Sequence, residues 1–135
     1  MSVKNLEKSS KKKILLAEDD DSMRRFLEIT LQRANFSVIS TEDGLEAMKA
    51  TLENEIDAIV ADAIMPNLSG YDLCRIFRQN PDNGKTPFII LSGFNKEDSP
   101  KSEDCPADAF LTKKDNLKEE LIQTLARLLN KKVES

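Results

Sequence analysis

The chain has 135 residues, of which 39% are hydrophobic and 33% charged, and this size predicts one soluble globular domain with a single core. A formal net charge of −4 argues against a protein that binds nucleic acid directly. The sequence offers no apolar run long enough to span a membrane, and its lysine-rich start lacks the apolar segment of a secretory signal.

Short apolar segments alternate with amphipathic segments along the chain. In chain order we predict a strand at 14–17, a helix at 22–34, a strand at 36–40, a helix at 44–53, a strand at 56–61, a helix at 71–79, strands at 88–91 and 107–112, and a helix at 116–130. Strands that alternate with helices imply right-handed crossovers. We therefore predict an α/β fold, a doubly wound five-stranded parallel sheet with helices on both faces.

Two of the expected helices, at 44–53 and within 94–106, have weaker apolar patterns than the others. The segment 44–53 places Leu45, Met48 and Leu52 on one face of its helix. Between the last two strands, alternation calls for a fourth helix, but residues 94–106 contain two prolines and no apolar stripe. We expect a short or irregular helix there.

The two cysteines, Cys74 and Cys105, form no CxxC pair. Two scattered cysteines are typical of reduced thiols, which predicts a cytoplasmic protein.

Polar side chains follow four of the predicted strands. Glu18 and Asp19 come after the first strand, Asp62 after the third, Ser92 after the fourth and Lys113 after the fifth. In an open α/β sheet the functional crevice lies at the carboxyl ends of the strands, so we expect these groups to share one edge. Mg²⁺ prefers oxygen ligands and is usually held by one or two carboxylates plus a phosphate, which would let these acids lie close together.

Taken singly, these residues also have ordinary structural explanations. Asp20, Asp21 and Ser22 suit a helix N-terminus, and we expect Asp21 or Ser22 to be the cap. The strand-end residues suit turns or solvent exposure, but that does not explain their joint placement at one edge. An EF-hand is excluded, because the acidic run lacks the glycine and the closing glutamate of that loop.

Four motifs, LLAEDDDSMRR, DAIVADAIMPNLSGYDL, PFIILSG and ADAFLTK, occur in an order and spacing that resemble a response-regulator receiver domain, the phosphoacceptor of two-component signalling. The resemblance covers about residues 13 to 130. It implies the flavodoxin-like strand order 2-1-3-4-5. It also implies a receiver domain at 13–131, between a flexible lysine-rich N-terminal tail at 1–12 and a C-terminal tail at 132–135.

The resemblance assigns a role to each acidic residue of the edge. Asp62 would accept a phosphoryl group from a phosphohistidine, and Asp19 would be the main Mg²⁺ ligand. Glu18 would assist through water, and Ile64 would offer its backbone carbonyl to the metal. Together with Phe94, Ile64 would also flank the path of a hydrolytic water, which predicts slow loss of the phosphoryl group.

The same resemblance assigns Ser92 to a phosphoryl oxygen and Lys113 to the phosphoryl charge. When Ser92 moves inward, the space it leaves can admit Phe110, which would act as a switch. An ordinary strand aromatic is the rival explanation for Phe110.

One departure from the family pattern concerns the lysine. Receivers usually follow it with a proline after a cis bond, whereas Lys114 follows Lys113 here, so we expect a trans bond. Lys114 is an alternative active lysine. We favour Lys113, because neighbouring strand side chains point to opposite faces.

The sequence contains no histidine and cannot carry its own phosphohistidine, so the phosphodonor must be another protein or a small molecule. The resemblance implies that the donor protein is a sensor histidine kinase or a histidine phosphotransfer protein. We expect a phosphoacceptor that assists its own phosphorylation and dephosphorylation rather than an enzyme, and that acts on an output protein without contacting nucleic acid or a membrane. A phosphatase of the haloacid-dehalogenase type needs a second aspartate two positions after the first, where Ile64 stands. The remaining alternative is a receiver-like interaction module that works without phosphorylation.

Overall fold

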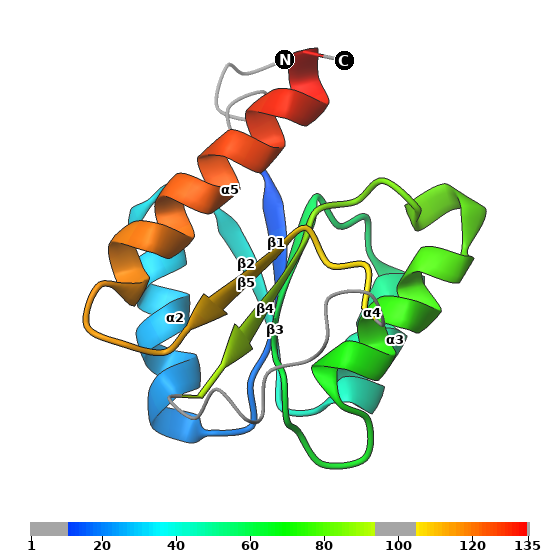
Figure 1. The fold of residues 1–135 in the computed structure, drawn as a ribbon, viewed down its shortest axis with the longest axis horizontal. Coiled ribbons are helices and arrows are strands. Elements are labelled where there is room, and N and C mark those ends of the chain that lie inside the picture. The colour runs from blue at the N-terminus through cyan, green and yellow to red at the C-terminus, as the bar shows by residue number, and fades with distance from the viewer. Residues whose placement is uncertain (1–10, 94–104, 135) are drawn as a thin grey trace, which may run out of the picture.

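The computed structural model describes residues 11–93 and 105–134. Its centre is a five-stranded parallel sheet in the order β2-β1-β3-β4-β5 (Figure 1). The strands are β1 (Lys13–Ala17), β2 (Ser37–Thr41), β3 (Ala58–Asp62), β4 (Phe88–Ser92) and β5 (Ala109–Thr112). The predicted fold class and strand order are confirmed.

Helices cover both faces of the sheet (Figure 1). One face carries α2 (Asp21–Arg33) and α5 (Leu117–Glu134), and the other carries α3 (Gly44–Glu53) and α4 (Gly70–Gln79), which is followed by the 3-10 turn η1 (Pro81–Asn83). The region predicted to hold a short fourth helix falls mostly on residues 94–104, which lie outside the described residues. Within the described ranges, no helix has the length and apolar character needed to cross a bilayer.

The core consists of two layers, one on each side of the sheet. Along β1, Ile14 and Leu16 face the layer under α2 and α5, while Leu15 and Ala17 face the layer under α3 and α4. All residues of β3 and β4 are buried. Strands covered on both faces have no solvent side, which is why these strands are apolar nearly throughout.

The predicted helix at 44–53 is confirmed as α3, and of the three apolar residues on its expected common face only Met48 packs on the core. Leu45 is 54% exposed and Leu52 is 79% exposed, and the residues that face the sheet are Gly44, Ala47 and Ala50. A Cβ atom at Gly44 would lie 2.2 Å from a backbone oxygen of the β3–α4 loop. The helix therefore approaches its neighbours closely through small residues, and the larger leucines remain at the surface.

Candidate functional site

The strand ends bring all five predicted polar residues to one edge of the sheet. Asp62 is the last residue of the central strand β3, and Ala61 of that strand pairs with Ala17, just before Glu18 and Asp19. On the other side of β3, Ser92 ends β4. This edge lies at the carboxyl ends of β1, β3, β4 and β5, where a parallel α/β sheet leaves an opening between its connections.

Three carboxylates meet at this edge. Glu18, Asp19 and Asp62 each offer an oxygen, and these oxygens lie within 4.8 Å of one another. Glu18 is fully buried and Asp62 is 8% exposed, whereas Asp19 is exposed. A set of hard oxygen donors that is buried on one side and open on the other matches the coordination preferred by Mg²⁺, which keeps part of its water shell.

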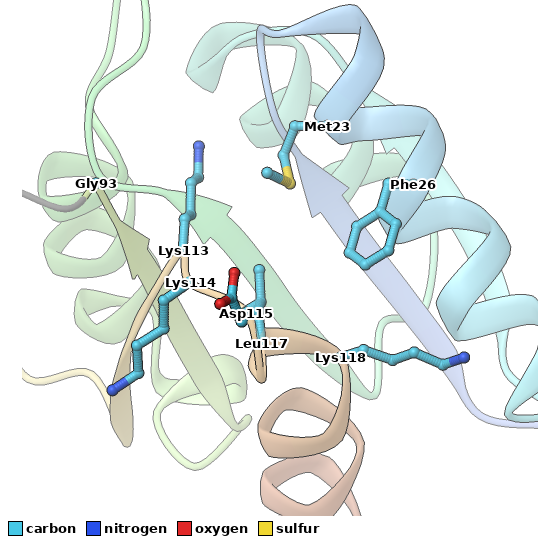
Figure 2. A pocket seen from close by; sticks show the side chains of 8 residues that line it. All are labelled: Met23, Phe26, Gly93, Lys113, Lys114, Asp115, Leu117 and Lys118. Atoms are coloured by element: carbon cyan, nitrogen blue, oxygen red, sulfur yellow. The ribbon is translucent and has the colours of Figure 1, made fainter.

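Lys113 is the cation of the cluster. Its Nζ atom lies 2.8 Å from Oε1 of Glu18 and 3.0 Å from Oδ1 of Asp62. The Lys113 backbone N–H donates to the carbonyl of Ser92 at 2.8 Å, so strand pairing continues to the site. Lys114 is exposed, and its side chain extends in the opposite direction (Figure 2). No cis peptide bond occurs among the described residues, so the Lys113–Lys114 bond is trans, as expected.

The electrostatics of the cluster favour an added cation. Burial raises the pKa of Glu18 and of Asp62 above their ordinary values, and Lys113 opposes this shift in both. Asp62 further raises the pKa of Glu18, and Asp19 does the same to Asp62. Burial alone lowers the pKa of Lys113, but Glu18 and Asp62 outweigh it and raise that pKa. The carboxylates of Glu18 and Asp62 are thus less stable as anions than they would be in water, and a divalent ion would stabilise their charged forms.

A pocket of about 270 Å³ opens directly over Asp62. Ala63, Ile64, Ser92, Gly93 and Lys113 form the rest of its described lining. Ile64 is 61% exposed at its rim, and Ser92 is buried in its wall.

Phe110 takes no part in lining that pocket. It is half-buried on β5, pairs with Ile90 and packs on the core layer under α3 and α4. The structure therefore places the expected switch residue below the site rather than beside Asp62.

The acidic loop between β1 and α2 is held by its own hydrogen bonds. Asp20 is the N-cap of α2, and its Oδ2 accepts the Met23 N–H at 2.7 Å. The Asp20 N–H donates to Oε2 of Glu18 at 3.1 Å. Our expectation that Asp21 or Ser22 would be the cap is wrong, because the buried Glu18 fixes Asp20 where its side chain reaches the helix terminus.

The backbone of Asp62 is held from the opposite face. The N–H of Gly70, the first residue of α4, donates to the carbonyl of Ala63 at 3.0 Å. A Cβ atom at Gly70 would lie 2.2 Å from the carbonyl oxygen of Asp62. The start of α4 is thus in direct contact with the end of β3, which sequence reasoning did not anticipate.

A second, more apolar pocket of about 380 Å³ adjoins the first (Figure 2). Met23 and Phe26 of α2 face Leu117 and Lys118 of α5 across it. Gly93 and Lys113 line both pockets. Phe26 belongs to the apolar stripe predicted for the helix at 22–34, yet it is 43% exposed and lines this pocket.

This arrangement of fold and acidic edge is that of a known class of signalling domain. The chain matches the response regulator receiver domain family over residues 14–126, and it belongs to that family. Receiver domains of this kind are the signalling domains of response regulators in two-component systems.

Two relatives illustrate the match in sequence. The response regulator ArlR of Staphylococcus saprophyticus is 33% identical over 117 residues, which cover 86% of this chain and 52% of the relative. ArlR of Staphylococcus aureus is 30% identical over 119 residues, which cover 87% of this chain and 52% of the relative. The chain therefore spans about half the length of these relatives.

Solved structures agree. The receiver domain of the Francisella response regulator 1452 is 31% identical with a TM-score of 0.79, over 90% of this chain and 98% of that one. The response regulator TrrA of Thermotoga maritima, solved in complex with Mg²⁺ and BeF, is 25% identical with a TM-score of 0.75, over 87% of this chain and 98% of that one.

Proposed function

We propose that this domain accepts a phosphoryl group on Asp62 from a phosphohistidine of a sensor histidine kinase or a histidine phosphotransfer protein. The observation that supports this most strongly is the position of Lys113, whose ammonium lies between Asp62 and Glu18 at the mouth of a pocket that Ser92 also lines. A carboxylate nucleophile, a cation and a hydroxyl at one opening are the groups that phosphoryl transfer requires.

The acidic cluster fits Mg²⁺, because it places three carboxylate oxygens together, one each from Glu18, Asp19 and Asp62. Among the described residues, Lys113 is the only cation at salt-bridge distance from any of these carboxylates. When bound, Mg²⁺ supplies positive charge against which the phosphoryl oxygens and the carboxylates are both stabilised. Ile64 lines the same pocket, and we propose its backbone carbonyl as a further oxygen ligand of the metal.

Asp62, Lys113 and Ser92 each have a separate role in the transfer of the phosphoryl group. A carboxylate oxygen of Asp62 forms the new bond to phosphorus as the bond from phosphorus to the donor nitrogen breaks, and the donor histidine leaves with that electron pair. Lys113 stands 3.0 Å from Asp62 Oδ1, within reach of one phosphoryl oxygen. The Ser92 hydroxyl, in the wall of the same pocket, donates to another.

A switch follows from the new charge. The phosphoryl group on Asp62 competes with Glu18 for the Lys113 ammonium, and it attracts the hydroxyl of Ser92. Because the Lys113 N–H is bonded to the Ser92 carbonyl, movement of one strand end is passed to the other. We propose that Phe110, packed on β5 below this link, changes position in response.

We propose that the phosphodonor protein binds an apolar surface of this domain beside the phosphoacceptor pocket. Met23, Phe26 and Leu117 line the apolar pocket that shares Lys113 with the phosphoacceptor pocket (Figure 2). An apolar side chain of the donor seated there would bring a neighbouring phosphohistidine to Asp62. The output is proposed to be a change in contact with another protein or with further segments such as those present in the longer relatives.

The proposal is tested by incubating the protein with acetyl phosphate and Mg²⁺ and recording its intact mass. We expect the mass of one phosphate in the wild type, loss of that gain when EDTA replaces Mg²⁺, and no gain in Asp62→Asn. Phosphorylation of Asp62→Asn would contradict the proposal. A wild type that binds partner proteins yet never gains phosphate would instead support a module that works without phosphorylation.

A further inference from the structure

Arg24 contacts the acidic loop from within α2. Its side chain is only 17% exposed, and Nη1 donates to the main-chain carbonyl of Glu18 at 3.0 Å. Nη2 pairs with Oδ1 of Asp21 at 2.5 Å and lies 3.7 Å from a carboxylate oxygen of Glu42, at the start of the β2–α3 connection. One guanidinium therefore joins the acidic loop, the first turn of α2 and the next connection along this edge.

The Glu18 carbonyl is the important acceptor among these three. It belongs to the peptide group that links Glu18 to Asp19, the two candidate metal ligands of the loop. A peptide group is planar, so a hydrogen bond that fixes the direction of its oxygen also restricts the bonds to the Cα atoms on both sides. The side chains of Glu18 and Asp19 leave those Cα atoms, one into the buried interior and one toward solvent.

Other contacts hold the same loop on either side. The N–H of Glu18 donates to the Thr41 carbonyl at 3.1 Å, and the N–H of Asp20 donates to the Glu18 side chain at 3.1 Å. Arg24 donates the hydrogen bond to the carbonyl oxygen of the peptide group that links Glu18 to Asp19. Among the described residues no other donor contacts the Glu18 carbonyl, so without Arg24 the peptide group between the two like-charged residues would lose its one fixed orientation.

We infer that Arg24 is a positioning residue for the divalent-cation site, and that it holds Glu18 and Asp19 in the orientation in which both can serve the same ion. This inference rests on the proposed Mg²⁺ site. Arg24 has two possible influences of opposite sign on the affinity for Mg²⁺. As a nearby positive charge it weakens binding, so its removal would tighten binding, whereas as a positioning group its removal weakens binding.

The test measures the dissociation constant for Mg²⁺ by isothermal titration calorimetry, together with the melting temperature in the absence of Mg²⁺. Arg24→Met removes both the charge and the hydrogen bonds. Arg24→Lys keeps the charge but replaces the planar, two-armed donor by a single ammonium. Arg25→Met is the matched control, because it removes the same charge from the next residue of α2, whose side chain is exposed.

We expect Arg24→Met to weaken Mg²⁺ binding about fivefold to tenfold. This is a smaller loss of affinity than follows removal of a residue that hydrogen-bonds the side chain of a metal ligand, because Arg24 contacts the backbone of the ligand. Arg24→Lys should fall between Arg24→Met and the wild type, and Arg25→Met should change affinity less than about twofold, in line with a screened exposed charge. A residue with a merely structural role would lower the melting temperature and leave the dissociation constant of the folded protein unchanged.

Unchanged or tighter Mg²⁺ binding in Arg24→Met would overturn the inference, as would an equal loss in Arg25→Met. If Arg24→Met does not fold, the inference is decided by Arg24→Lys, and wild-type affinity in that variant overturns it. A wild type that binds no Mg²⁺ at all would instead defeat the proposed function, so the two failures are distinguishable.

Discussion

The Nζ atom of Lys113 lies 3.0 Å from Oδ1 of Asp62. Lys113 follows β5 and Asp62 ends β3, and β4 lies between these two strands in the sheet. The same Nζ lies 2.8 Å from Glu18, which follows β1 on the far side of Asp62. One ammonium therefore reaches across the carboxyl ends of the central strands. The long lysine side chain makes this reach possible. Because the ammonium is in direct contact with Asp62, a change in the charge of Asp62 acts directly on Lys113.

Lys113→Ala should slow phosphorylation by acetyl phosphate about tenfold or more, since a preorganised charge at the phosphoryl oxygens is lost. Lys114→Ala should leave the rate within about twofold, because that side chain is exposed and extends away from Lys113 (Figure 2). The rate of mass gain measures both variants, with circular dichroism to establish that they fold. Equal effects would mean that Lys114 can serve the site.

Ile64→Asn should shorten the lifetime of the phosphorylated form about tenfold. This is a smaller rate increase than a general base gives, because an amide can orient a water molecule but does not take its proton. Ile64 lines the pocket over Asp62, where an apolar side chain excludes water and an amide would orient it. Leu52→Asn is the control, because Leu52 is 79% exposed on α3. An unchanged rate of phosphate loss in Ile64→Asn would refute this shielding. Phe94, the other expected shield, lies outside the described residues.

Gly70→Ala should lower the free energy of unfolding by about 1–3 kcal/mol, because the new methyl group would meet the Asp62 carbonyl oxygen. Gly84→Ala is the matched control, since its backbone has φ −64° and its nearest neighbour to an added Cβ lies 3.9 Å away. That variant should be unchanged or slightly more stable. Urea unfolding of both variants decides the matter, and equal stability would show that α4 can shift without cost.

Cys74 should react very slowly with iodoacetamide in the folded protein. Burial first, and then the neighbouring Cys105, raise the pKa of its thiol to about 12. The thiolate is the reactive form, so at pH 8 only about one molecule in ten thousand is ionised, and the rate should rise about tenfold for each pH unit. Peptide mapping after alkylation, with and without urea, measures this. Native labelling as fast as labelling in urea would contradict the burial of Cys74.

Much of the fold follows from local pattern. Strands covered by helices on both faces must be apolar throughout, and β3 and β4 are recognisable for that reason. Leu117, Leu121 and Leu125 recur at helical spacing, and all three are buried against the sheet. The polar groups of the site were found because topology brings the carboxyl ends of parallel strands to one edge.

What the pattern did not show depends on contacts between distant segments. The buried face of α3 is set by how closely Ala47 and Ala50 let the helix approach, and the leucine spacing does not contain that distance. The cap of α2 is set by a hydrogen bond from the Asp20 N–H to Glu18, and the role of Arg24 by its reach to the Glu18 carbonyl. In each case a tertiary contact decides between local arrangements that the sequence leaves equally acceptable.

The central claim is that Asp62 is the residue that carries the phosphoryl group. Borohydride reduces an aspartyl phosphate to homoserine, so reduction after loading with acetyl phosphate and Mg²⁺, followed by tandem mass spectrometry of the peptides, locates the modified carboxylate directly. The account predicts homoserine at position 62 and none at positions 18 or 19. Homoserine at either of those positions, or its absence from a protein that has gained the mass of a phosphate, would contradict it.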